Sequence, residues 1–165
     1  MSEISDAIQA KCLAFSDRII KLNDYLLEQA ASKRYEVRKG KLAFSHQTSD
    51  LSQPSSFSHQ PSRVPVHLQS VAALANQLLR SGTSIGANNA EASSAISKAD
   101  FKSKSYIALK EARESLYWLD LLHRNNYLTD VQYQSLYTDC DELVKVLTHR
   151  CKKLDENEDK DGKKK

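Results

Sequence analysis

Two short motifs in this 165-residue chain have the residue types of catalytic sites. Gly82 to Gly86 matches the G-x-S-x-G pattern of a nucleophilic serine, which needs a strand before it and a helix after it. Here the motif lies inside a helical pattern, where small residues allow close packing. Asp120 and His123 loosely resemble the E-x-x-H ligands of di-iron bundles, but the sequence holds no second copy. We therefore expect no catalytic residue and no enzymatic activity, and we interpret His123 as a polar residue near a helix end.

The other histidines and the cysteines do not form a metal-binding pattern. His46, His59 and His67 lack the spacing of a zinc site. The three cysteines have no C-x-x-C spacing, and Cys12 and Cys140 lie on apolar stripes, where a free thiol acts as a small hydrophobic group. We expect no metal and no cofactor. Because charged residues stand where a secretory leader would be apolar, we also expect a reduced, cytoplasmic setting.

A basic cluster lies between residues 33 and 41. It consists of Lys33, Arg34, Arg38, Lys39 and Lys41. Glu36 is the one acidic residue in this stretch, and Tyr35 is available for stacking. Cations attract phosphate backbones because binding releases condensed counterions. The cluster predicts a nucleic-acid-binding surface, and an ordinary solvated helix end is the alternative that the sequence leaves open.

The spacing of apolar residues predicts four helices that would position these groups. Steps of three and four residues place the apolar side chains on one stripe of each helix. The expected ranges are about residues 5–33, 66–96, 98–125 and 130–154. Ser97 to Asp100 and Thr129 to Gln132 have the spacing of capping boxes, which mark the starts of the third and fourth helices. Four Gly and three Pro are too few for the turns of an all-β fold.

The helical pattern is absent between the first two helices and after the fourth. Residues 45–62 are rich in Ser and Pro without periodicity, so we expect a mobile loop over about residues 40–63. The charged residues 155–165 are expected to form a flexible tail. We predict an all-α domain over residues 1–154, an antiparallel up-down-up-down four-helix bundle with a long connection between its first two helices. No stretch is long and apolar enough to cross a membrane.

The predicted second helix carries few charges. Between Val66 and Ser97 only Arg80 and Glu91 are charged, although a solvent-facing helix normally carries many more. This predicts contact on more than one side, including contact with another subunit. We assign to a homo-oligomer interface Arg80, Ser84, Asn88 and Glu91, with Lys110, Glu114, Tyr117 and Leu121 of the third helix. The charged ends of the first group are expected to pair with Lys110, Glu114 or a neighbouring subunit. An intramolecular polar network and a ligand site are the alternatives.

Three motifs in the second half of the chain occur together. Arg80 to Ala92 follows R-S-x-x-S-I-x-A-N-x-A-E-A, Ser97 to Phe101 follows S-K-x-D-F, and Lys110 to Leu122 follows K-E-A-x-E-x-x-Y-W-L-x-L-L, with Leu116 before Tyr117 and Trp118. With these motifs the chain resembles the bacterial four helix bundle protein family, also called the ribosomal-RNA intervening-sequence protein family. The resemblance implies a four-helix protomer that assembles into a ring-like homopentamer without known catalytic activity.

Two departures from the family pattern bear on this chain. Asn89 stands where the family usually has an aliphatic residue, so an amide lies on an apolar face and must find hydrogen-bond partners. The connection over residues 34–64 is much longer than is usual in the family, and it could cover or extend the surface that the family uses.

Two functions are consistent with the sequence. The first is a non-enzymatic homo-oligomeric scaffold that binds RNA or DNA. The resemblance adds a reverse transcriptase as a partner, because the family includes accessory proteins of diversity-generating retroelements. The alternative is a protein–protein adaptor without affinity for nucleic acid.

Overall fold

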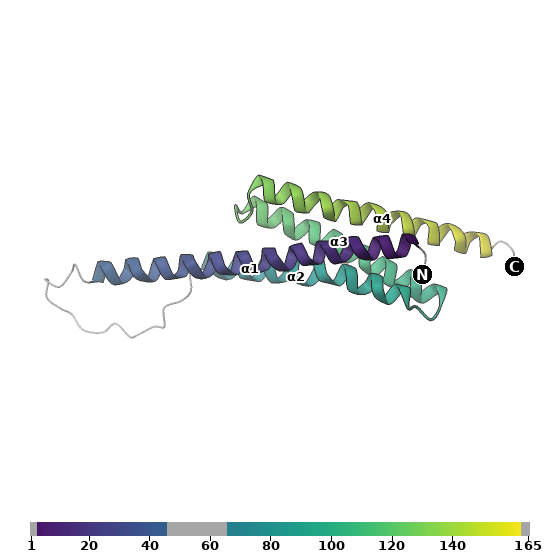
Figure 1. Cartoon of the computed structure of the whole chain (residues 1–165), viewed down its shortest axis with the longest axis horizontal. Coiled ribbons are helices and arrows are strands. Elements are labelled where there is room, and N and C mark those ends of the chain that lie inside the picture. Colours follow the sequence, from purple (N-terminus) through teal and green to yellow (C-terminus); the bar gives the residue numbers. More distant parts are fainter. Residues whose placement is uncertain (1–2, 46–65, 163–165) are drawn as a thin grey trace.

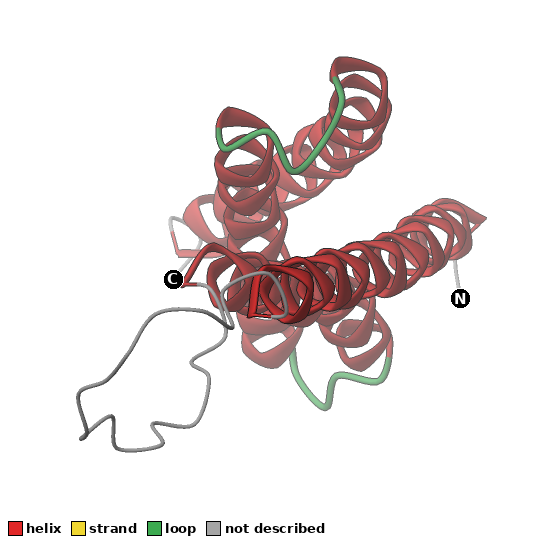
Figure 2. Ribbon diagram, turned by 90° about the vertical axis from the view of Figure 1, so that its left-hand side faces the viewer, coloured by secondary structure: helices red, strands yellow, loops and turns green. Residues whose placement is uncertain are grey.

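The structure, a computed structural model, describes residues 3–45 and 66–162. Its elements are the helices α1 (Glu3–Ser45), α2 (Val66–Ser93), α3 (Lys98–Arg124) and α4 (Asp130–Gly162) (Figure 1). Seen end-on, short loops join α2 to α3 and α3 to α4 (Figure 2). Each helix packs on the next along the chain, and α4 also packs on α1 in the least extensive of the four helix–helix contacts. The all-α, four-helix prediction is therefore confirmed.

The predicted apolar stripes form the core. On α1, every residue of the stripe is buried: Ile8, Cys12, Phe15, Ile19, Leu22 and Leu26. These side chains join one cluster with apolar residues of the other three helices, such as Ile85, Leu119 and Leu143. The core runs along the bundle because each helix turns the same face inward over several turns.

The two predicted capping boxes are present. Ser97 has an extended backbone, and its hydroxyl accepts from the Asp100 N–H at 3.1 Å. Thr129 and Gln132 cap reciprocally: the Gln132 N–H donates to the Thr129 hydroxyl at 3.3 Å, and the Thr129 N–H donates to the Gln132 side-chain oxygen at 3.0 Å. Local sequence therefore fixes where α3 and α4 begin.

Three helix ends differ from the prediction. α1 continues to Ser45, beyond residue 33, and α4 continues to Gly162, through most of the expected tail. Both extensions lack an apolar stripe, and neither contains proline, the residue least compatible with a helix interior. α2 ends at Ser93, and Ile96 is 95% exposed instead of lying on the buried face. The remainder of the expected loop, residues 46–63, and the last residues, 163–165, lie outside the described residues.

All three cysteines are buried free thiols. Burial raises the pKa of Cys12 to about 11 and that of Cys140 to about 12. The Cys140 thiol donates to the carbonyl of Ala112 at 3.3 Å. Because a thiol is a weak nucleophile until it ionises, these residues act as small apolar groups.

The Gly-Thr-Ser-Ile-Gly motif packs α2 closely against α1. A Cβ atom added to Gly82 would lie 3.1 Å from Cγ1 and 3.2 Å from Cγ2 of Ile19, whereas one added to Gly86 would lie 3.4 Å from Cβ of Cys12. The motif sits in the middle of a helix, without the strand that a nucleophile elbow requires. Its residues serve the packing that the sequence favoured.

We expect Gly82→Ala to lower the free energy of unfolding by about 1 kcal/mol, because overpacking against Ile19 costs more than the ~1 kcal/mol that alanine gains in a helix. Gly86→Ala is the matched control. Its new methyl group has room, so the helix propensity dominates and stability should rise by several tenths of a kcal/mol. Urea denaturation of both variants measures the difference, and a shift of the same sign for both would contradict this packing.

Candidate functional site

The predicted nucleic-acid cluster lies on the part of α1 that continues past the start of α2. The α1–α2 register is set by the Gln9 amide, which donates to the Gly86 carbonyl, and by the Ser16 hydroxyl, which donates to the Gly82 carbonyl, both at 3.4 Å. This antiparallel register brings Val66 opposite the region of Ser32. Residues 33–45 therefore extend beyond α2 (Figure 1). The side chains of Lys33, Arg34, Arg38, Lys39 and Lys41 lie outside the described residues, although their backbone is helical.

The predicted interface edge of α2 makes contacts within the protomer. The Glu91 carboxylate forms an ion pair with Lys104 of α3. The Asn88 amide donates to the Ser84 carbonyl at 2.9 Å. Partial burial and the neighbouring Glu114 raise the pKa of Glu111. The positive charges of Lys110 and Arg80 offset part of this increase. Glu91 therefore pairs with Lys104, not with Lys110 or Glu114. The contact lies within one protomer, as in the alternative of an intramolecular polar network.

The outer face of α3 carries a continuous line of basic and aromatic side chains. We call it the α3 stripe, and its members are Tyr106, Lys110, Arg113, Tyr117, Leu121 and Arg124. Steps of four and three residues keep them on one face. All but Leu121 are exposed. Lys110, Tyr117 and Leu121 were assigned to a subunit contact from the sequence, whereas Tyr106, Arg113 and Arg124 were not assigned to any site, although their spacing is visible there.

The tyrosines of the α3 stripe are held by neighbouring side chains. The Tyr106 hydroxyl donates to Asp155 at 2.6 Å, and Asp155 also pairs with Lys102 at 2.8 Å. Tyr117 packs edge-on against Trp118, with ring centroids 4.8 Å apart and planes at 71°. The Trp118 indole N–H donates to Glu114 at 3.0 Å, so this carboxylate is engaged at the side of the stripe.

A second surface, on the seam between α1 and α2, is apolar. Leu13, Ile20 and Leu27 follow one another at seven-residue steps and are 56%, 44% and 42% exposed. They share a stripe with Gln9 and Ser16, which contact α2. On α2, Leu79, Thr83 and Ala90 share a stripe with Gly86, which contacts α1. We call these six residues the α1–α2 seam: Leu13, Ile20, Leu27, Leu79, Thr83 and Ala90. It carries no charge.

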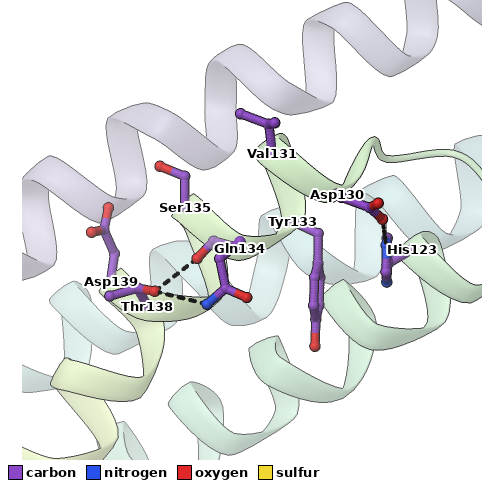
Figure 3. A pocket seen from close by; sticks show the side chains of 8 residues that line it. All are labelled: His123, Asp130, Val131, Tyr133, Gln134, Ser135, Thr138 and Asp139. Carbon is purple, nitrogen blue, oxygen red and sulfur yellow. Dashed lines mark hydrogen bonds and ion pairs between the residues drawn. The ribbon is translucent and has the colours of Figure 1, made fainter.

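An open groove of about 730 Å³ lies on the first turns of α4 (Figure 3). His123 Nε2 is 2.7 Å from a carboxylate oxygen of Asp130, and the His123 ring stacks on Tyr133 with centroids 4.1 Å apart. Tyr133 donates its hydroxyl to Asp120 at 2.6 Å, which helps to raise the pKa of Tyr133 to about 12. Asp120 and His123 thus have different hydrogen-bond partners, Tyr133 and Asp130, and do not bond to a common atom. Among the described residues, no group of three or more acidic, histidine or cysteine side chains is arranged to hold a metal ion.

The amide of Asn89 finds its partners in a buried network. Asn89 is fully buried, and its Nδ2 donates to Gln9 Oε1 of α1 at 2.5 Å. Its Oδ1 accepts from Arg150 Nη1 of α4 at 2.6 Å. The Arg150 guanidinium also lies 5.7 Å from the ring centroid of Phe101 on α3, and burial lowers its pKa. The sequence predicted that the Asn89 amide needs hydrogen-bond partners, and this is confirmed: the partners come from α1 and α4.

Known proteins resemble this chain in sequence and in structure. Residues 65–149, just over half of the chain, match the family described as 23S rRNA-intervening sequence protein. A crystal structure of a protein with unknown function from the S23 ribosomal protein family, from Bacteroides thetaiotaomicron, is 34% identical with a TM-score of 0.64. The similarity covers 90% of this chain and 98% of that one. The comparison with curated proteins found no match. Within residues 3–45 and 66–162, none of the helices has the length and apolar character needed to span a membrane.

We expect Asn89→Leu to lower the free energy of unfolding by about 2–4 kcal/mol, because Arg150 loses its acceptor in a largely buried site. Replacing Arg150 by Met in the same chain should restore most of this loss, since the charge is then removed as well. Asn88→Leu is the control. Among the described residues, the Asn88 side chain bonds to Ser84 of its own helix, so the change should stay within about 0.5 kcal/mol. Thermal and urea denaturation measure these effects, and a double variant no more stable than Asn89→Leu would contradict the role of Arg150.

Proposed function

Because this chain belongs to the 23S rRNA-intervening sequence protein family, we propose that it is a non-enzymatic helical scaffold that self-associates and binds nucleic acid. The observation that carries the proposal is the continuation of α1 to Ser45, past the start of α2. It places the five-cation cluster on a regular helix beyond the bundle. A helix of 13 residues is about 20 Å long, enough for contacts with several phosphates.

Self-association is supported by the α1–α2 seam. The occupant that we propose is a second copy of this chain. Leu13, Ile20 and Leu27 have the seven-residue spacing with which helices pack along one another. The small residues on the α2 side allow a close approach, and no charge has to be desolvated. The pentameric ring implied by the family resemblance is part of this proposal, as are the cytoplasmic location and a reverse transcriptase as partner.

The same seam supports the alternative function, a protein–protein adaptor. An uncharged line of aliphatic side chains suits a helix of another protein as well as a second copy. An adaptor of this kind would not require the basic segment of α1, which therefore separates the two functions.

We expect the chain to bind RNA or DNA with an affinity that falls steeply between 50 and 200 mM salt. Replacing Lys33, Arg34, Arg38, Lys39 and Lys41 by Gln should weaken binding and reduce the slope of log K against log salt by about three to four per protomer. Fluorescence anisotropy with a labelled RNA measures both. The control replaces five exposed lysines elsewhere: Lys21, Lys98, Lys152, Lys153 and Lys160. An equal loss in the control would mean that the cluster on α1 is not the binding surface. Absence of binding, or a weak affinity that ignores both salt and the substitutions, would favour the adaptor.

We expect light scattering to give a mass near five protomers, the number that the family resemblance implies. Ile20→Asp should lower this mass, because a carboxylate would have to be buried in the α1–α2 seam. Val131→Asp is the matched control, since Val131 is 80% exposed on α4 and away from the seam. A monomeric wild type would contradict self-association, and a mass unchanged by Ile20→Asp would place the contact elsewhere.

A further inference from the structure

We infer that the α3 stripe is a second binding surface, which takes single-stranded nucleic acid through base stacking on Tyr106 and Tyr117 and phosphate contacts with Lys110 and Arg113. This inference rests on the proposed nucleic-acid function. It assigns to α3 a task different from that of the basic segment of α1: the selection of unpaired bases over duplex.

The spacing of the α3 stripe fits a single strand of nucleic acid that lies along the helix. Tyr106 and Tyr117 are eleven residues apart, which corresponds to about 16 Å along the axis. Lys110 and Arg113 stand between them on the same face, at steps of four, three and four residues. A strand of several nucleotides can therefore place bases on the two rings and the phosphates between them on the two cations.

The cations of the α3 stripe are available for such contacts. Lys102 and Lys104, on the first turns of the same helix, each form an ion pair with a carboxylate. Lys110, Arg113 and Arg124 are exposed and form no ion pair with a described residue. A bound phosphate would gain their charge without first displacing a carboxylate.

The aromatic rings are both exposed and restrained. Tyr106 and Tyr117 are 37% and 57% exposed, the first tied by its hydroxyl to Asp155 and the second packed edge-on against Trp118. Restraint before binding lowers the entropy lost when a base stacks. The acids beside the two rings, Asp155 and Glu114, already accept hydrogen bonds.

Alternating cations and aromatic rings favour a single strand over other anionic partners. Every base has a π-face, so stacking on tyrosine tolerates any sequence. In a duplex those faces are covered by neighbouring bases, and only phosphates and groove edges remain accessible. An acidic peptide without aromatic side chains would use Lys110 and Arg113 but would leave Tyr106 and Tyr117 unstacked.

The test compares a 20-nucleotide unstructured RNA with an RNA duplex of the same length by fluorescence anisotropy. The variant Tyr106→Leu/Tyr117→Leu keeps apolar bulk and all charges. We expect it to weaken single-strand binding at least ~10-fold, because base–aromatic stacking is lost, and to change duplex binding less than about twofold. The variant Lys110→Gln/Arg113→Gln should weaken the binding of both RNAs and reduce the slope of log K against log salt by about two.

Tyr25→Leu, a change to a 40% exposed tyrosine on α1, is the control and should leave both affinities unchanged. Circular dichroism and light scattering on every variant confirm fold and mass. An equal loss for both RNAs, no loss in the tyrosine variant, or a lower mass would overturn the inference, the last because the stripe would then be a contact between copies. A wild-type chain that binds neither RNA would instead contradict the proposed function itself.

Discussion

The close approach of α1 and α2 determines much of the remaining geometry. Where Gly82 and Gly86 face α1, no side chain of α2 separates the helices, and Ile19 and Cys12 pack directly on the glycine positions. The same carbonyls accept from Ser16 and Gln9, so packing and hydrogen bonds specify one register. That register brings Gln9 beside Asn89 and sends the end of α1 past the start of α2.

The buried network then relates α4 to this pair of helices. The contact between α1 and α4 is the least extensive of the four, and the exposed ion pair between Lys11 and Glu142 contributes little to stability in water. Arg150, in contrast, reaches the fully buried Asn89 and lies over Phe101. A partly buried cation needs an acceptor at a defined position, so this network restricts how α4 can slide or rotate against its neighbours.

Local patterns predicted the parts of the fold that depend on few residues. A 3.6-residue period reports which face of a helix is buried, and the stripe of α1 was correct throughout its length. Capping boxes require contacts only three residues apart, so Ser97 and Thr129 could be identified directly. The ends of α1 and α4 were placed too early because an apolar stripe reports burial, whereas the helical backbone continues past the last buried residue of each helix.

The candidate surfaces were less accessible to sequence reasoning because they depend on neighbours distant in the chain. Asn89 could be recognised as an amide that needs partners, but Gln9 and Arg150 are 80 and 61 positions away. The spacing from Tyr106 to Tyr117 is visible in the sequence. The sequence does not show which lysines of α3 pair with carboxylates, because Lys102 pairs with a residue of α4 and Lys104 with a residue of α2.

The burial of the three thiols also changes what their number implies about redox environment. A chain with unpaired cysteines suggests a compartment that keeps them reduced. Here the raised pKa values of Cys12 and Cys140 suppress the thiolate, and the surrounding side chains exclude oxidants. In the folded chain these thiols are therefore poorly reactive, and their presence alone does not indicate a reducing compartment.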